Sequence, residues 1–196
     1  METPYLLIDN WFNKEEEQLV WQELDYYSSQ NKFFRGEDSN AMALRDGVPQ
    51  GKHYRLHLDD VYSQRNISNI LTLKDKLTQK DFIDKIEQAF PMGRTFYQTN
   101  FDNTLLSYYE DGDDYKQHFD NVFITVLIWF YREPKLFEGG DFIFNDSNEK
   151  IECKHNRLIA YPGYYYHSVE PVKMKTEEKF KYGRYTITHF FSNKNV

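Results

Sequence analysis

The sequence contains a single cysteine, Cys153, among its 196 residues. One cysteine cannot form an intrachain disulfide, and it cannot supply the paired thiolates of a CxxC zinc or redox motif.

Long apolar runs are also absent. The longest strongly apolar stretch covers residues 122–131, whereas a helix that spans a membrane needs about 20 such residues. The N-terminal stretch Met1-Glu-Thr-Pro-Tyr5 has neither the basic nor the apolar region of a secretory signal. We therefore expect a soluble, cytoplasmic protein with no membrane partner.

Basic residues are in deficit. Lys and Arg together number 24 and Asp and Glu 31, which gives a formal net charge of −7. This balance argues against a protein that holds nucleic acid mainly through phosphate contacts. Aromatic residues make up 18% of the chain, so a disordered polypeptide is excluded.

The motifs of several enzyme classes are missing as well. The sequence has no GxSxG elbow, no phosphate-binding GK[ST] loop, no GxGxxG and no HExxH. The remaining chemistry depends mainly on the six histidines.

Helical signals lie in the first part of the chain. Asn13 and Glu16 have the spacing of an N-cap and its N3 partner, and apolar residues then recur at helical spacing. A second helix is predicted over Thr78–Ala89, with Pro91 ending it. The polar, turn-rich segment Gln30–Gln50 between them is interpreted as a long loop, and a functional lid is one hypothesis for it.

From residue 95 onward the pattern changes to the period of two that strands show. Many short strands without intervening helices favour an antiparallel sandwich or barrel, and a jelly roll is one natural closure. We therefore predict a single α+β domain, in which residues 1–94 give helical support with the lid and residues 95–196 form the jelly-roll core. The predicted strands lie at Leu105–Tyr109, Val122–Tyr131, Asp141–Phe144, Arg157–Tyr161 and Arg184–Phe191.

His118-Phe-Asp120 has a spacing that matters on a strand. Residues i and i+2 project from the same face, so the imidazole and the carboxylate would point the same way. Two histidines and one carboxylate on one face are the ligands of non-haem Fe(II) oxygenases. His167 is the candidate for the third ligand; it lies 47 residues after Asp120, directly after a Pro-Gly turn and three tyrosines. The alternative for His118 and Asp120 is a surface hydrogen-bonded pair.

Arg184 opens the final predicted strand. Its guanidinium offers a planar fork that suits the far carboxylate of a dicarboxylate co-substrate. The alternative is a surface ion pair with an acid such as Glu170.

Together these segments resemble the 2-oxoglutarate- and Fe(II)-dependent dioxygenases, and specifically their prolyl 4-hydroxylase branch. The stretch from Tyr109 to Asp120 matches the YxxGxxYxxHxD pattern of that branch at every fixed position. The other similar motifs follow in the family's order: Tyr5–Phe12 as the opening strand, then Glu138-Gly-Gly-Asp141, His167–Val172 and Arg184–Thr188.

The resemblance implies a double-stranded β-helix core, that is, a jelly roll, and it implies a role for each of five residues. His118, Asp120 and His167 would bind Fe(II), while Arg184, helped by Tyr109, would hold the distal carboxylate of 2-oxoglutarate. O2 is then the second co-substrate, and ascorbate is a candidate reductant.

One departure from the family concerns the basic residue. Members usually carry it about ten positions after the distal histidine, whereas Arg184 follows His167 by 17 positions. The extra residues fall within Lys173–Lys181, a charged stretch that we interpret as a longer hairpin loop. Lys175 is nearer the usual spacing, but it lies in that loop, so we favour Arg184 and keep Lys175 as the alternative.

The reaction that the resemblance implies is hydroxylation of an unactivated C–H bond with release of succinate and CO2. A prolyl residue of a peptide or protein is the leading substrate. Asp120 argues against halogenation, because related halogenases lack the carboxylate. Alternative functions are oxygenation of a free amino acid or other small molecule, nucleic-acid demethylation, and ligand binding by a non-catalytic jelly roll.

The other histidines are interpreted as structural. Apolar and polar residues alternate over 53–58, which predicts a half-buried strand with His53, Arg55 and His57 on a polar outer face. His155 is expected in a solvated turn, and His189 is expected to face away from the iron site.

Aromatic residues near these motifs have two interpretations. The run Tyr164–Tyr166 could line a substrate channel, or it could serve packing alone. Trp129 and Phe130 lie inside the long apolar run, and we predict that they belong to the core.

Overall fold

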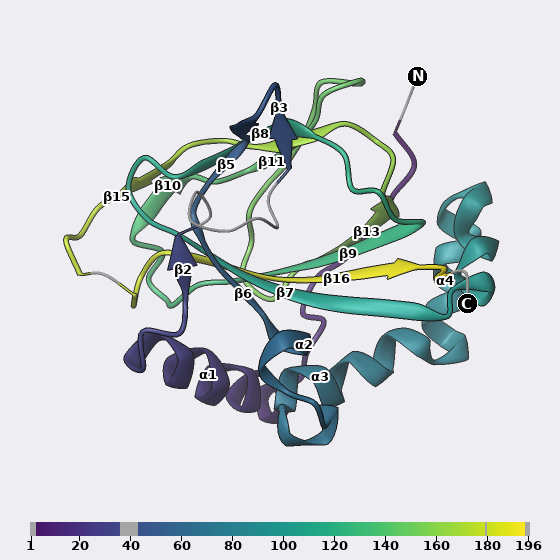
Figure 1. Cartoon of the computed structure of the whole chain (residues 1–196), viewed down its shortest axis with the longest axis horizontal. Coiled ribbons are helices and arrows are strands. Elements are labelled where there is room, and N and C mark those ends of the chain that lie inside the picture. The colour runs from purple at the N-terminus through teal and green to yellow at the C-terminus, as the bar shows by residue number, and fades with distance from the viewer. Residues whose placement is uncertain (1–2, 36–42, 179, 195–196) are drawn as a thin grey trace.

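The computed structural model of the chain describes residues 3–35, 43–178 and 180–194. In these ranges two main β-sheets face each other, and the helices cover the outer face of the larger sheet (Figure 1). No helix of the described chain is both long enough and apolar enough to cross a membrane.

The larger sheet is antiparallel and contains the longest strands. From one edge to the other, its strands are β1 (Leu6–Ile8), β13 (Leu158–Pro162), β9 (Ile124–Phe130), β16 (Arg184–Ser192), β7 (Phe101–Tyr109), β6 (Tyr54–His57) and β2 (Phe34–Arg35).

The smaller sheet lies across from it. Its strands are, in order, β12 (Glu149–Ile151), β11 (Phe142–Phe144), β14 (His167–Val169), β8 (Asp114–His118) and β5 (Gly51–Lys52). Two short antiparallel pairs complete the strands: β10 (Phe137–Gly139) with β15 (Val172–Met174), and β3 (Leu44–Arg45) with β4 (Val48–Pro49).

Helices pack beneath the larger sheet, as Figure 1 shows for α1 and α3. The helices are α1 (Lys14–Ser29), α2 (Leu58–Val61), α3 (Asn69–Leu73) and α4 (Lys80–Ala89), with 3-10 turns at Arg65–Ile67, Lys74–Thr78 and Pro91–Gln98. Asn13 caps α1 in the predicted way: its side chain accepts from the Glu16 N–H at 2.9 Å, and the Glu16 carboxylate accepts from the Asn13 N–H.

Two apolar clusters follow from the alternation of side chains along each strand. On β7, Leu106 and Tyr108 join the cluster between the larger sheet and the helices, whereas Tyr109 joins the cluster between the two sheets. On β16, Tyr185 and Ile187 likewise pack toward the helices. The alternate residues of these strands therefore face the space between the sheets.

Most of the predicted elements are confirmed. The five predicted strands correspond to β7, β9, β11, β13 and β16, and the α+β class is confirmed. The helix predicted over Thr78–Ala89 begins at Lys80, because Lys74–Thr78 forms a 3-10 turn instead.

The prediction that Gln30–Gln50 is a long loop is wrong in part. It contains the short strands β2, β3 and β4, and β2 extends the larger sheet by pairing with β6. Residues 36–42 of the proposed lid lie outside the described ranges. Residues 1–94, predicted as helical support, also supply β1, β2, β5 and β6 to the main sheets.

Candidate metal centre and adjoining cavity

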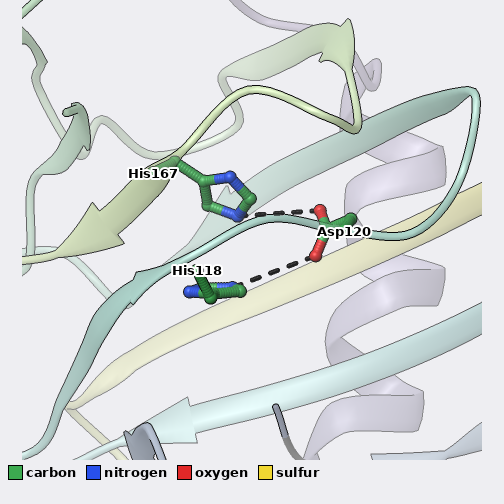
Figure 2. Close-up of side chains that lie close together, drawn as sticks. All are labelled: His118, Asp120 and His167. Atoms are coloured by element: carbon green, nitrogen blue, oxygen red, sulfur yellow. Dashed lines mark ion pairs between the residues drawn. The ribbon is translucent and has the colours of Figure 1, made fainter. Parts of the chain in front are cut away.

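Three potential metal ligands converge where the smaller sheet ends. His118 is the last residue of β8 and lies directly opposite His167, the first residue of β14, while Asp120 follows two positions after His118. The Asp120 carboxylate lies 3.9 Å from His118 Nε2 and 3.6 Å from His167 Nε2. Dashed lines mark these two pairs in Figure 2. All three ligand atoms lie within 4.8 Å of one another.

Backbone carbonyls fix the orientation of both imidazoles. Nδ1 of His118 lies 2.8 Å from the Lys116 carbonyl oxygen, and Nδ1 of His167 lies 2.9 Å from the Tyr165 carbonyl oxygen. A carbonyl oxygen can only accept, so each Nδ1 carries the proton and each Nε2 keeps its lone pair toward Asp120. This is the arrangement in which a histidine ligates a metal through Nε2.

Hydroxyl groups hold the carboxylate of the cluster. The Thr125 hydroxyl donates to Asp120 Oδ2 at 2.7 Å, and the Tyr161 hydroxyl lies 3.3 Å from the same oxygen and from His167 Nε2. Burial raises the pKa of Tyr161 well above its usual value, so its hydroxyl remains a donor. Neither residue was singled out from the sequence.

Gly163 allows the Asp120 backbone to approach closely. Its carbonyl accepts from the Asp120 N–H at 2.8 Å, and a Cβ at this position would lie 2.5 Å from the Val122 carbonyl oxygen. Any side chain here would push the Asp120 segment away. The Pro-Gly turn seen in the sequence therefore has a packing cause.

Electrostatics favour the metal-binding form of His118. Burial, with a smaller effect from neighbouring His167, lowers its pKa from 6.5 to about 4. The ring is therefore neutral at physiological pH, as a metal ligand must be.

A cavity of about 320 Å³ adjoins the three ligands, and side chains from both sheets line it. The register runs across the larger sheet from Arg55 on β6 to Ser107 on β7 and Thr186 on β16, and all three residues line the cavity. The floor of the cavity is therefore the inner face of the larger sheet, with its ligand-bearing wall on the smaller one.

The interpretation of the 53–58 segment needs correction. The predicted alternation is present, but its polar face points inward, because Arg55 and His57 line the cavity and His53 is wholly buried. His53 stacks on Tyr109 with ring centroids 4.5 Å apart, and burial lowers its pKa well below 6.5. The polar face is covered because the smaller sheet lies over it.

Arg184 and Tyr109 lie side by side, since they are register partners on β16 and β7. The Arg184 guanidinium carbon lies 4.6 Å from the centre of the Tyr109 ring. Tyr109 lines the cavity, while Arg184 behind it has no exposed surface. Among the described residues, none of the three guanidinium nitrogens has a hydrogen-bond partner.

The alternative basic residue, Lys175, and the alternative partner of Arg184, Glu170, both form ion pairs elsewhere. Lys175 is half exposed and pairs with Glu138 at 3.0 Å, on the surface. Glu170, considered as a surface partner for Arg184, instead pairs with Lys150 at 2.7 Å. A buried guanidinium without an acidic partner is costly, so its surroundings suit a bound anion.

Two further expectations have different outcomes. His155 is not solvated: its Nε2 lies 2.9 Å from Glu17, and its ring stacks on Trp21 of α1. His189 does face away from the metal ligands, because it lies between β16 and the helices and its Nδ1 is 3.0 Å from the Thr104 hydroxyl.

None of the three tyrosines before His167 lines the cavity. Tyr164 and Tyr166 are exposed, whereas Tyr165 is partly buried against the cluster between the sheets. Tyr166 packs edge-on against Phe119, an exposed residue that does line the cavity. Contact of Tyr164–Tyr166 with substrate stays a prediction.

Comparison with known proteins agrees with this geometry. Residues 104–192 match the sequence model of the 2OG-Fe(II) oxygenase superfamily. No curated protein matches the sequence.

Several solved structures share the fold across almost the whole chain. A Pseudomonas putida prolyl-4-hydroxylase superposes with a TM-score of 0.67 at 13% identity, over 97% of this chain and 94% of that one. A Trichoplax adhaerens prolyl hydroxylase, solved with a peptide fragment of the hypoxia-inducible-factor oxygen degradation domain, gives a TM-score of 0.67 at 16% identity, over 97% and 84%. A Burkholderia pseudomallei oxidoreductase of the 2OG-Fe(II) oxygenase family gives 0.61 at 13% identity, over 98% and 86%. Identities this low establish the fold alone, which is the double-stranded β-helix expected from the sequence.

Proposed function

Since residues 104–192 match the 2OG-Fe(II) oxygenase superfamily and the chain has the fold of the prolyl 4-hydroxylases, we propose that the protein is an Fe(II)- and 2-oxoglutarate-dependent dioxygenase. It hydroxylates an unactivated C–H bond and releases succinate and CO2. The substrate we favour is a prolyl residue of a peptide or protein, in line with the peptide in the Trichoplax complex.

One observation carries the proposal. Two imidazoles present lone-pair nitrogens, and one carboxylate presents its oxygens, toward a common point at the wall of a cavity. Each imidazole is held by a backbone carbonyl and the carboxylate by a threonine hydroxyl, so the ligands are oriented before any metal arrives. His118, Asp120 and His167 are therefore the proposed ligands of Fe(II).

Each part of the cavity has a role in the proposed reaction. Bound Fe(II) would supply the redox chemistry that couples decarboxylation of 2-oxoglutarate to C–H hydroxylation. Arg184 provides the positive charge for the distal carboxylate, and Tyr109 packs against that guanidinium. Leu127, Phe142 and Val169 give the cavity apolar walls that exclude bulk water.

The first experiment measures 2-oxoglutarate turnover. Purified protein with Fe(II), ascorbate and 2-oxoglutarate is expected to form succinate slowly without substrate, and His118→Ala is expected to abolish it. Equal succinate release by the native protein and His118→Ala would refute the catalytic assignment.

A second experiment addresses the substrate. Proline-containing peptides, free proline and a neutral peptide without proline are incubated with the enzyme, and products are read by a mass gain of one oxygen. Oxygen gained by the prolyl peptides alone supports the proposal. Oxygen gained by free proline alone would replace the peptide substrate with a small molecule.

A further inference from the structure

One ring nitrogen at the cavity lacks a hydrogen-bond partner. His57, the last residue of β6, lines the cavity, and its Nε2 is buried and makes no hydrogen bond among the described residues. A buried polar atom without a partner is costly, so native proteins usually satisfy it with protein, water or ligand. Because His57 lies at a cavity, a ligand that fills this cavity is the natural source of the missing hydrogen bond.

The other ring nitrogen of His57 decides which kind of group can bind. Nδ1 lies 3.1 Å from Oδ1 of Asn103 on β7. An amide oxygen can only accept, so Nδ1 carries the proton and Nε2 keeps a lone pair. The missing partner is therefore a hydrogen-bond donor.

His57 lies well away from the residues proposed for 2-oxoglutarate. It pairs with Leu105 on β7, whereas Arg184 pairs with Tyr109, four positions further along the same strand. Four residues of a strand span about 13 Å, which is longer than the carbon chain of 2-oxoglutarate. A co-substrate held at Arg184 therefore does not reach His57, and the donor has to belong to the substrate.

Along the strand direction, His57 lies close to the level of the metal ligands. Its partner Asn103 is in register with Phe190 on β16, which in turn pairs with Thr125 on β9. The Thr125 hydroxyl holds the carboxylate of Asp120. His57 is thus placed where a substrate lies when its C–H bond is close to the proposed iron.

Arg55 adds a donor beside this acceptor. Two positions before His57 on β6, it points to the same face of the sheet and also lines the cavity. Two residues of a strand span about 7 Å, so the guanidinium donors and the Nε2 acceptor can flank one peptide group. The C=O and N–H of a trans peptide group point in opposite directions, so the carbonyl can face Arg55 while the N–H faces His57.

We propose that His57 is a specificity-determining residue whose Nε2 accepts a hydrogen bond from the backbone N–H that follows the target prolyl residue. This inference rests on the proposed function, which supplies the prolyl peptide as substrate. A prolyl nitrogen has no N–H of its own, and along the chain the N–H of the next residue is the nearest to the prolyl ring. The site then selects peptides over free proline. It also disfavours the first proline of a Pro-Pro pair, because the second proline supplies no N–H.

The test follows the acceptor nitrogen directly. The full-length protein, labelled with ¹⁵N at its six histidines and loaded with 2-oxoglutarate and with Zn(II) in place of Fe(II), is titrated with two peptides. One is acetyl-Ala-Ala-Pro-Ala-Ala-amide, and the other is its analogue with an ester in place of the amide that follows proline. The Nε2 signal of His57 is assigned by its loss in His57→Gln. We expect the amide peptide to move this signal upfield and the ester peptide to leave it nearly unchanged.

Calorimetry on the same samples measures affinity. His57→Leu is expected to weaken binding of the amide peptide about fivefold, the effect of one hydrogen bond, and to leave binding of the ester peptide unchanged. His57→Gln keeps an acceptor at the tip of its side chain and should retain most of the affinity. The matched control is His155→Gln, because His155 pairs with Glu17 outside the cavity and should alter binding of neither peptide.

The outcomes separate this inference from the proposed function. An unmoved His57 signal with the amide peptide bound, or unchanged affinity for that peptide in His57→Leu, overturns the role of His57 while the function stands. If neither peptide binds, the inference and the prolyl-peptide substrate fail together, and succinate formation decides the dioxygenase assignment separately. If His57→Leu does not fold, the shift of the wild-type signal with each of the two peptides decides.

Discussion

Replacing Arg184 by methionine should stabilise the unbound protein and at the same time abolish its response to 2-oxoglutarate. The guanidinium is wholly buried and, among the described residues, has no hydrogen-bond partner for any of its nitrogens. Methionine has a similar length and fills the space without a charge. On the proposed function, Arg184 serves ligand binding at a cost to the stability of the unbound protein.

The size of the effect follows from the contacts. Each buried nitrogen without a hydrogen-bond partner costs about 1–3 kcal/mol, and within the described part of the chain the guanidinium has three of them. The contact with the Tyr109 ring, at 4.6 Å, returns about 2 kcal/mol. We therefore expect Arg184→Met to raise the free energy of unfolding by at least about 1 kcal/mol, and the Tm by about 2–4 °C for each kcal/mol.

Thermal unfolding of the Zn(II)-loaded proteins measures both effects. At 100 times its Kd, 2-oxoglutarate should stabilise the wild-type protein by about 2.7 kcal/mol and Arg184→Met not at all. Arg157→Met is the matched control: Arg157 is paired with Asp9 near the surface, so its loss should lower stability slightly or leave it unchanged. An unbound Arg184→Met protein that is less stable than wild type would refute the reasoning.

Three further predictions concern two residues that support Asp120 and one buried histidine. Thr125→Val removes the 2.7 Å hydrogen bond to Asp120, so Fe(II) affinity should fall about 10- to 100-fold by metal titration; retained affinity would contradict the orienting role of the hydroxyl. Gly163→Ala places a methyl 2.5 Å from the Val122 carbonyl oxygen, so the free energy of unfolding measured in urea should fall by about 1–3 kcal/mol. Metal binding should weaken as well, and wild-type values of both would mean that the loop adjusts without cost. Burial lowers the pKa of His189 to about 3, below the 6.5 of the unfolded chain, so the unfolded state takes up the proton first as pH falls. The free energy of unfolding should therefore decrease from pH 6.5 toward pH 3, by up to about 1.4 kcal/mol per pH unit from this group. Urea unfolding across this range should give a shallower curve for His189→Gln, and an identical slope would exclude the assignment.

Local patterns determined much of this protein. The cap at Asn13 and the strands at Leu105–Tyr109 and Arg184–Phe191 depend on neighbours within a few residues, so the sequence was sufficient to predict them. His118 and Asp120 were paired on the alternation of a strand, but β8 ends at His118, so Asp120 lies just beyond the strand and is held by its backbone hydrogen bond to Gly163 instead. His167 was added from the order of motifs along the chain, and its position opposite His118 in the sheet agrees with that choice.

The tertiary structure decided which face of each strand is inside. A period of two separates the two sides of the segment 53–58, but it does not say which side a second sheet will cover, and here the polar side with Arg55 and His57 is enclosed. The partners of Asp120 also come from β9 and β13, strands that meet it only after the sheets close, so Thr125 and Tyr161 have no signal in sequence spacing. Trp129 shows the same limit: its burial follows from its place in the apolar run, but only the packed structure shows that its N–H has no acceptor among the described residues. Short-range periodicity therefore determined the helices and strands, and the order of motifs along the chain determined the choice of metal ligands. Long-range register and the packing of one sheet on the other determined the cavity and the side chains that line it.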